Sequence, residues 1–410
     1  MIDADRIRRI SVIAKKDAEY KKEEQLKCPS LRIDYLNQNI FINDKLQDLA
    51  PEDYAVKNDM DCWLQYLSGF DEFTGDIERL KQTAWMILNY TFVSPFIAEL
   101  RYRYAQLTDD YDIAYPMYLI LIGPKSNGKS AVVKVCQKLV LGMDVQKVDR
   151  KNFRQKELKS LDETVIGCPV LIDDITKTDW QYSERIVKSD RVLVDCHLEN
   201  HPCYMITSND VETSKDSVIK RIIVMRVQNQ IGADRGKELV LWVRKVTRQM
   251  SNAWFRAYTA RLFPKLQECI QRIRWNPDLD VPDIFQISSE ILDNMVKEYG
   301  FANVPSLRTF TWKDYMGDEV TSEESIEIIR ELFKTSPELF TIDRKNNKLI
   351  LDLGGYNDNG RTLRLLMNEL PVSVEKRRFG NKISMKLDEI ERWTDTHFKK
   401  KRGLFRRRKG

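Results

Sequence analysis

The sequence predicts an α/β protein in which a mostly parallel sheet is covered by helices. Four short apolar runs, at residues 116–122, 169–172, 204–206 and 222–225, are typical of strands that are buried on both faces. A glycine-rich loop directly follows the first run and leads into a helix-forming segment. A helical hydrophobic period is present before and after these strands. Strands separated by helical segments favour helices packed on a parallel sheet.

The chain of 410 residues is longer than one hydrophobic core usually supports, so two or three domains are expected. Apolar residues make up 42% and charged residues 31%, which excludes a collagen-like, disulfide-framework or wholly disordered chain. No apolar run is long enough to span a membrane, and no apolar segment follows the charged N-terminus. The sequence therefore predicts a soluble protein of the cytoplasm with no membrane partner. Its seven cysteines lack a C-x-x-C pair and are expected to be reduced.

The positive charge is concentrated at the C-terminus. The net charge is +5, yet residues 399–410 alone carry eight basic side chains and no acidic one. A local cluster of this kind is typical of an arm that contacts a polyanion. A tail that only increases solubility is the alternative.

The first part of the chain, residues 1–105, is expected to be a helical N-terminal domain. Residues 1–30 are highly charged with a helical period, and residues 31–43 alternate like two short strands around a turn. Apolar residues between 61 and 100 suit packed helices that are interrupted at Ser68-Gly69 and at Pro95. The strand-containing core is assigned to residues 106–232.

Two further regions follow the core. The period from Leu239 to Ala257 predicts one long amphipathic helix within a helical segment, residues 233–300. Residues 301–396 combine a helix at 322–335, strands at 340–343 and 348–351, a helix at 360–370 and a hairpin near 377–380, which predicts a winged-helix-like domain before the basic tail, 397–410. Its basic side chains form a candidate DNA-contacting face or a merely solvated surface: Arg361, Arg364, Lys376, Arg377, Arg378 and Lys382.

The loop at residues 123–130 fits the phosphate-binding pattern G-x-x-x-x-G-K-[ST]. Close approach of backbone N–H groups to phosphate oxygens requires glycine at the two ends, and the following helix N-terminus adds positive potential. Lys129 is the candidate ligand of the β- and γ-phosphates, and the Ser130 hydroxyl is a candidate Mg²⁺ ligand. The predicted ATP-phosphate residues are Gly123, Pro124, Lys125, Ser126, Asn127, Gly128, Lys129 and Ser130.

Polar residues at the ends of the next strands complete a predicted catalytic site. Asp173 and Asp174 follow the second apolar run, where Asp173 is the second candidate Mg²⁺ ligand and Asp174 the candidate base for the attacking water. A simple turn is the alternative for this pair. Asn209 ends the third strand, where a neutral amide would hold the water or the γ-phosphate. Arg221, before the fourth strand, is the candidate arginine finger, with an ordinary strand-edge cation as the alternative.

The order of these motifs resembles that of superfamily 3 helicases, in the AAA+ branch of P-loop ATPases. The resemblance covers residues 116–228, and residues 61–100 have a general likeness to the helical collar of those proteins. Within the superfamily, the chain is similar in particular to the helicase modules of phage and plasmid primase-helicases, including that of a deep-sea vent phage primase-polymerase. It implies ATP and Mg²⁺ as cofactors and a homo-hexameric ring with ATP between subunits. It also implies a channel hairpin at about 188–204, where Lys188, Arg191 and His197 are candidate contacts to single-stranded DNA or ordinary structural residues. The tip carries Asp195 and Glu199 where relatives are more basic.

Together these features predict an ATPase that acts as a DNA helicase or translocase in the replication of a phage or plasmid, with a linked primase or polymerase as a further partner. The alternative is a DNA-binding initiator or assembly platform, whose ATP site gates ring formation with little unwinding. A small-molecule kinase is a second rival, which Thr207-Ser208-Asn209 and the basic tail disfavour.

Overall fold

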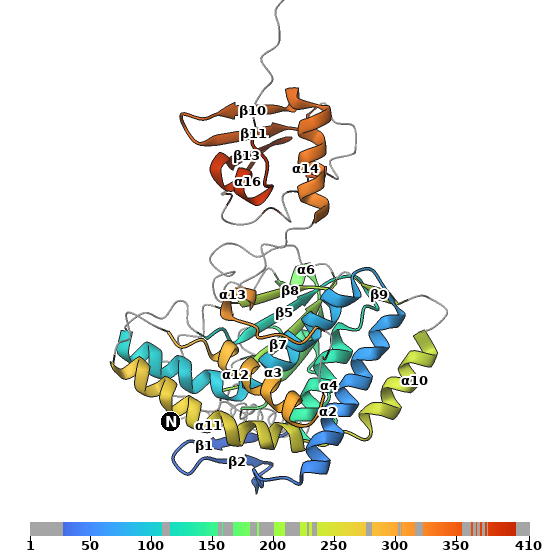
Figure 1. Ribbon diagram of the computed structural model, residues 1–410, viewed down its shortest axis with the longest axis vertical. Helices are drawn as coiled ribbons and strands as arrows, with labels where there is room; N and C mark the ends of the chain where they lie inside the picture. The colour runs from blue at the N-terminus through green and yellow to red at the C-terminus, as the bar shows by residue number, and fades with distance from the viewer. Residues whose placement is uncertain are drawn as a thin grey trace, which may run out of the picture. The chain divides into compact units, whose positions relative to one another are not determined.

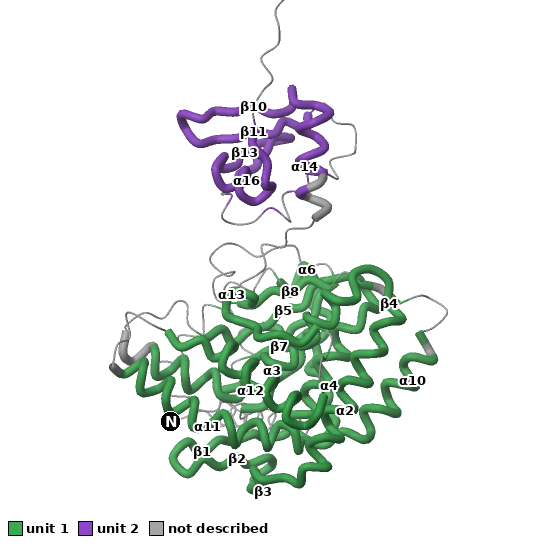
Figure 2. Tube along the Cα trace, viewed as in Figure 1, with its two compact units in different colours: residues 1–316 green, residues 317–410 purple. Residues whose placement is uncertain are grey.

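In the computed structural model the chain forms two compact units, residues 1–316 and residues 317–410 (Figure 2). The structure describes residues 28–108, 115–154, 167–180, 201–209, 222–227, 229–231, 236–275, 281–301, 306–315, 323–354 and 376–398, with single positions at 158, 187, 304, 362, 363, 366, 370 and 374. Within these residues, no helix is long and apolar enough to cross a membrane. Six cysteines there are buried and free.

A parallel four-stranded sheet forms the centre of the first unit (Figure 1). Its strands are β5 (Tyr118–Ile122), β6 (Val170–Ile175), β7 (Tyr204–Ser208) and β8 (Ile222–Arg226), in the order β6-β7-β5-β8. All three pairings are parallel, and Val148 adds a single parallel bridge to Ile172 at the outer edge of β6. The sequence prediction of a parallel sheet is confirmed, and the carboxyl ends of its strands meet at one edge.

Helices that precede and follow the strands in the sequence share one hydrophobic core with the sheet. They are α2 (Asp53–Ser68), α3 (Ile77–Thr108), α4 (Lys129–Leu141), α10 (Gly236–Thr247), α11 (Ala253–Trp275) and α12 (Ile284–Glu298). Helix α4 packs on β6 and β7, and α3 packs on α4, α11 and α12. The indole rings of Trp63, Trp85 and Trp254 lie fully buried at this junction, in edge-to-face contacts of 5.6 Å and 6.3 Å between ring centroids.

Short elements complete the first unit. A small antiparallel sheet contains β1 (Leu31–Asp34), β2 (Asn39–Ile42) and β3 (Lys45–Leu46), as the alternation of residues 31–43 predicted. A second, two-stranded sheet pairs β4 (Phe73–Thr74) with β9 (Gln230–Ile231). The remaining single-turn elements are η1 (Gly69–Glu72), η2 (Arg150–Asn152), α6 (Lys177–Trp180) and α13 (Trp312–Tyr315).

The expected interruption at Pro95 is wrong, because α3 continues through it. Proline has no N–H to donate to the carbonyl four residues earlier, which here belongs to Thr91. The hydroxyl of Ser94 donates to that carbonyl at 2.9 Å and replaces the missing bond. A neighbouring side chain thus supplies the hydrogen bond that the backbone of this helix lacks.

The expected single helix around residues 239–257 is also wrong, because the chain ends α10 at Thr247 and starts α11 at Ala253. A buried carboxylate from α2 causes the break. Asp59 accepts hydrogen bonds from the backbone N–H of Ser251 at 2.7 Å and of Trp254 at 3.1 Å. It therefore acts as an N-terminal cap for α11 from a distant part of the chain.

The second unit combines helix α14 (Glu323–Thr335), the short η3 (Pro337–Leu339), a four-stranded antiparallel sheet and helix α16 (Leu387–Trp393). The strands are β10 (Phe340–Asp343), β11 (Lys348–Asp352), β12 (Arg377–Phe379) and β13 (Lys382–Lys386), in the order β10-β11-β13-β12. The expected boundary near residue 301 differs from the observed one at 316. Trp312 and Tyr315 stack on Phe285 of α12, which holds this segment in the first unit.

Candidate nucleotide-binding site

The glycine-rich loop connects β5 to α4 and is anchored to the end of β8. A Cβ atom on Gly123 would lie 1.8 Å from the carbonyl oxygen of Val227, so this approach of two backbones requires glycine. The Asn127 side chain donates to the same carbonyl at 2.6 Å. Gly128 has a φ of +84° at the N-terminus of α4, a left-handed conformation that glycine adopts without strain. These contacts hold the loop open around the first turn of the helix.

Lys129, the first residue of α4, folds its side chain back over the loop. Its ammonium donates to the carbonyl oxygens of Gly123 at 2.7 Å and Pro124 at 2.8 Å. It also donates to the amide oxygens of Asn127 at 2.9 Å and Asn209 at 3.2 Å. Burial lowers the pKa of Lys129 to about 8, although the nearby carboxylates of Asp174 and Asp173 favour the charged form. Neutral oxygens thus hold the ammonium at the place where phosphate oxygens would bind it.

Asp173 is surrounded by three donors. Its Oδ1 accepts hydrogen bonds from the hydroxyls of Ser130 and Thr207, the latter at 2.6 Å, and its Oδ2 accepts one from the ammonium of Lys147 at 2.7 Å. Burial alone would raise the pKa of Asp173. The hydrogen bonds from Lys147, Ser130 and Thr207 outweigh it and keep that pKa below the usual range. The carboxylate is therefore ionised near neutral pH.

An irregularity in the sheet directs the two acids. The pairing of β6 with β7 runs regularly from Val170 to Ile172 and resumes at Ile175, so Asp173 and Asp174 lie at a break in register. Asp174 has a φ of +61°, which an aspartate tolerates better than most residues. Its backbone N–H donates to the Thr207 hydroxyl at 2.9 Å. Thr207 therefore contacts both acids and holds the bulge in place.

Asn209 connects the loop to the second acid. Its side-chain N–H₂ donates to Asp174 Oδ1, and its amide oxygen accepts from the Lys129 ammonium. A continuous polar chain therefore runs from Lys129 through Asn209 to Asp174. The side-chain orientation of Asn209 is fixed at both ends of the amide, as a residue that positions water or phosphate would require.

These groups line one cavity of about 270 Å³, which brings together most of the predicted site. Its lining residues are Lys125, Ser126, Asn127, Gly128, Lys129, Ser130, Ala131, Lys147, Asp173, Asp174, Thr207 and Asn209. Gly123 and Pro124 contribute carbonyl oxygens to Lys129. Four predicted site residues, Arg221, Lys188, Arg191 and His197, lie outside the described residues.

Lys147 lines this cavity although no sequence motif predicts it. It reaches the site because the bridge between Val148 and Ile172 places its segment beside β6. A basic residue in an extended segment between the loop helix and the acidic strand is the only sequence signal, and it is a common one.

The oxygen atoms of Ser130 and Asp173 are in contact, so a hydroxyl and a carboxylate converge on one point at the mouth of the loop. In proteins, Mg²⁺ beside nucleotide phosphates is bound by oxygen atoms, with one carboxylate and few other protein ligands. The residues present therefore fit the predicted metal.

A second cavity of about 400 Å³ lies beside the same loop and is mainly apolar. It shares Gly128, Ser130 and Ala131 with the polar cavity. Its other walls come from the segment that spans the end of α2, η1 and β4, from α4 and Asp144 beyond it, from Ile231 of β9, and from α10. The apolar lining residues include Tyr66, Phe70, Phe73, Val135, Leu239 and Val243.

Comparisons with known proteins found one matching family model and several similar solved structures. Residues 37–212 match the family model described as the Aq_aa27 P-loop NTPase domain. No curated protein matches the chain. Among solved structures, it is similar to an active helicase, Cch of SCCmec type IV, with 11% identity over 76% of this chain and 68% of that one at a TM-score of 0.35. It is also similar to the JCV helicase, with 14% identity over 59% and 74% of the two chains at a TM-score of 0.23. A third similar structure is PCH-2 of C. elegans, with 15% identity over 52% and 67% at 0.24. The loop and the parallel sheet have the P-loop NTPase fold that the matched family model describes.

Proposed function

We propose that the protein is an ATP-dependent DNA translocase of the helicase type, which hydrolyses ATP at the subunit interfaces of a homo-hexameric ring and moves single-stranded DNA. The observation that carries the hydrolytic part is the polar chain from Lys129 through Asn209 to Asp174. It joins a phosphate-binding cation to a carboxylate through an amide, which is the set of groups needed to direct water at a terminal phosphate.

Each residue has a defined part in this proposal. The backbone N–H groups of the loop bind the phosphates, and Lys129 exchanges its neutral oxygen partners for phosphate oxygens. Asn209 orients the attacking water, and the Asp174 carboxylate accepts its proton. Ser130 and Asp173 would hold Mg²⁺, which when bound neutralises charge on the phosphate oxygens.

The apolar cavity beside the loop supports a nucleoside triphosphate over a smaller phosphate compound. It begins at Gly128 and Ala131, next to the place of the phosphates, and Phe73 contributes an aromatic ring to its wall. Burial of a nucleobase against such a wall provides binding energy that inorganic phosphate does not have.

The DNA and ring parts of the proposal rest on the sequence. Asn209 stands between an acidic strand and a predicted arginine finger, Arg221, in the order that resembles superfamily 3 helicases, and eight cations end the chain. A role in phage or plasmid replication, with a linked primase or polymerase, follows from the same resemblance.

The acidic tip of the predicted channel hairpin, Asp195 and Glu199, favours a second candidate. Carboxylates repel a DNA backbone in a channel. An ATP-gated DNA-binding initiator or assembly platform would need no strong grip there and would unwind little.

Turnover of ATP with and without single-stranded DNA, together with strand displacement on a forked duplex, separates the candidates. A translocase shows DNA-stimulated turnover and displacement, whereas the platform shows turnover and ATP-dependent assembly, seen by native mass, with little displacement. Lys129→Ala is the control for contaminating ATPases and should abolish turnover without unfolding the protein. Turnover of ATP at the wild-type rate in Lys129→Ala would contradict the assignment of this site.

Subunit mixing tests the ring. A finger that acts in trans serves the site of a neighbouring subunit, so Arg221→Ala and Asp173→Ala proteins should each be inactive and should regain some turnover when mixed. Lys220→Ala is the matched control for Arg221→Ala. If mixed rings form and stay inactive, Arg221 does not act in trans.

A further inference from the structure

The sheet of residues 317–410 has two different faces. Alternation along the strands and the pairing register place Phe340, Leu351 and Ile383 in one row, and Ile342, Leu349 and Met385 in the next. Five of these six side chains are buried, and they form one core with Ile329 and Leu332 of α14. This face is therefore the inner one.

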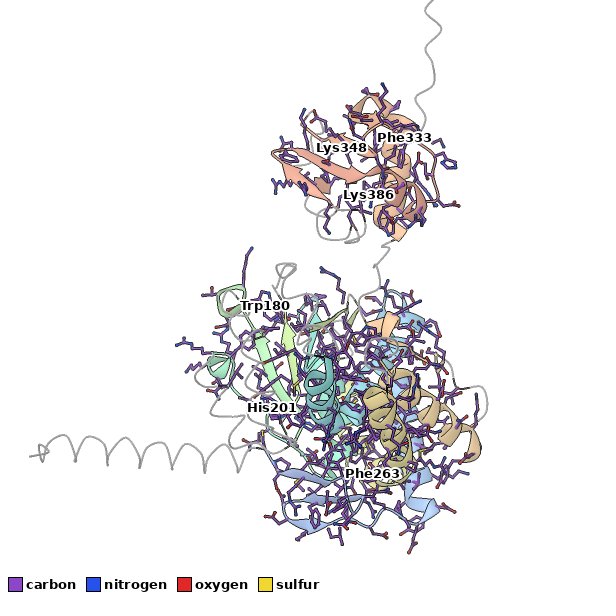
Figure 3. All side chains as sticks on the ribbon, turned by 90° about the vertical axis from the view of Figure 1, so that its left-hand side faces the viewer. Trp180, His201, Phe263, Phe333, Lys348 and Lys386 are labelled. Atoms are coloured by element: carbon purple, nitrogen blue, oxygen red, sulfur yellow. The ribbon has the colours of Figure 1, made fainter. Side chains whose placement is uncertain are left out.

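The outer face carries the alternate residues, of which Thr341, Lys348, Arg377, Phe379 and Lys382 are exposed, whereas Ser384 is buried. The same register gives its members as Thr341, Asp343, Lys348, Ile350, Asp352, Arg377, Phe379, Lys382, Ser384 and Lys386. Lys348 and Lys386, which Figure 3 labels, are direct partners on β11 and β13. Four of these ten residues are cations. We call this set the outer face.

Phe379 stands at the edge of the outer face with 60% of its surface exposed. It precedes the two-residue turn Gly380-Asn381 that connects β12 to β13, and it pairs with Lys382. The positive φ of Gly380, +59°, suits the tight hairpin turns that hold both strands in register. The ring is thus held at a rigid turn and directed away from the core.

The charges around this ring favour an anionic partner. Residues 376–386 contain five cations and no acidic residue. Of the two carboxylates on the outer face, Asp352 pairs with Lys382 at 2.8 Å, and Asp343 accepts hydrogen bonds from the side chain and the backbone of Asn346 in its own turn, at 2.7 Å and 3.2 Å. Lys348, which pairs with Asp343, and Arg377, on the edge strand β12, both occupy exposed positions.

We infer that the outer face binds single-stranded nucleic acid, with Phe379 stacking on a base and Lys348, Arg377 and Lys386 contacting phosphates. An exposed ring beside a row of cations on a sheet is the combination that single strands require, because their bases are free to stack and their backbone is uniformly negative. A protein partner would need a larger apolar area than one ring. Base-paired DNA offers no free base face to Phe379.

The test uses the full chain without nucleotide, so that its outcome is independent of the nucleotide site. Affinity for a fluorescent oligo-dT of 20 nucleotides is measured by anisotropy, beside a duplex of the same length. Phe379→Leu keeps an apolar side chain and removes stacking, so affinity for oligo-dT should fall about tenfold, within the range known for base stacking. Phe379→Trp should bind as the wild type does.

The cations are tested with a matched control on the opposite side of the sheet. Lys348→Glu combined with Arg377→Glu should weaken binding and flatten the salt dependence, by about 0.7 in the slope of log K on log[salt] for each lost phosphate contact. Lys334→Glu, on an exposed position of α14, should change the affinity much less. Ultraviolet crosslinking of 4-thiothymidine oligonucleotides should label peptides that contain Phe379 or Lys348.

Several results would overturn the proposal. One is that Phe379→Leu binds oligo-dT as tightly as the wild type while the crosslinks map only to other peptides. Another is that charge reversal on the outer face and at Lys334 weakens binding equally. A third is that the duplex binds as tightly as oligo-dT and its binding does not depend on Phe379. Preference for anionic lipid vesicles over oligo-dT would also overturn it. Equal melting temperatures exclude misfolding, and basal ATP turnover should be unchanged in these variants, so that failure here is separable from failure of the ATPase proposal.

Discussion

The ammonium of Lys147 lies 2.7 Å from Oδ2 of Asp173, while the hydroxyls of Ser130 and Thr207 bind the other oxygen of that carboxylate. The side chain of Lys147 is 53% exposed and that of Asp173 is 12% exposed. A half-exposed cation thus contacts the carboxylate that we assign to Mg²⁺. Entry of a metal ion would require this ammonium to move away.

Lys147→Met should therefore strengthen the binding of divalent cations in the absence of nucleotide. The exposed position limits the competing attraction, so we expect a gain of about fivefold. Mn²⁺ titration followed by electron paramagnetic resonance measures it directly. Lys151→Met is the control, since Lys151 is exposed on the neighbouring η2. Weaker Mn²⁺ binding in Lys147→Met would mean that Lys147 supports the metal site instead of competing with it.

Two glycines of the loop should differ in their tolerance of alanine. Gly123→Ala forces a methyl group against the Val227 carbonyl, 1.8 Å away, and should lower the free energy of unfolding by about 3 kcal/mol. Gly128→Ala meets only the Phe73 ring at 3.5 Å, but its φ of +84° should cost about 1 kcal/mol. Urea denaturation measures both. If both variants lose the same free energy of unfolding, the contact between Gly123 and the Val227 carbonyl relaxes at little cost.

Thr207→Val should damage the site through both acids. The change keeps the shape of the side chain, removes a donor to Asp173 and leaves the Asp174 N–H without its partner. We expect a loss of about 1–2 kcal/mol in the free energy of unfolding and at least about a tenfold fall in ATP turnover. Ser208→Ala is the control, because its hydroxyl donates to the Ile175 carbonyl at 2.8 Å. If both variants lose turnover equally, Thr207 has no special part.

Nucleotide affinity should depend on pH through Lys129. Its pKa is lowered from 10.5 to about 8, and phosphates favour the charged form, so binding should take up protons near pH 8 and weaken as pH rises further. Calorimetry in buffers of different ionisation enthalpy measures this uptake. Lys129→Arg stays charged and should show none.

The same shift has a defined sign for stability. Between about pH 8 and 10.5 the unfolded chain holds a proton on Lys129 that the folded chain has lost, so the contribution of this group to the free energy of unfolding rises with pH in that window. Lys129→Met should remove this contribution. A Lys129→Met variant with the pH profile of the wild type would indicate that burial does not shift this ammonium.

Local pattern predicted most of the residues that line the polar cavity at the glycine-rich loop. The two glycines, Lys129 and Ser130 lie in one short segment, and strand ends carry Asp173, Asp174 and Asn209. Parallel strands bring their carboxyl ends to one edge, so residues far apart in the sequence meet without further information. The proposed roles of Arg221, Lys188, Arg191 and His197 stay predictions.

Tertiary contacts decided the rest. Lys147 reaches Asp173 only because Val148 pairs with Ile172. No hydrophobic periodicity in the sequence predicts a single β-bridge of this kind. The helical pattern across residues 239–257 is continuous in sequence, yet Asp59 of α2 caps a new helix at Ala253. Pro95 should stop a helix, yet the hydroxyl of Ser94 satisfies the carbonyl that Pro95 leaves without a donor.

The sequence by itself thus determined the α/β class of this protein, its glycine-rich loop and the acids and amide beside it, because these depend on residue type, short spacing and strand direction. Only the tertiary structure decided where helices break, which cation faces Asp173 and which face of the second sheet exposes Phe379. Those features depend on side chains supplied by distant segments, and the energy of such a contact exists only once the chain has folded.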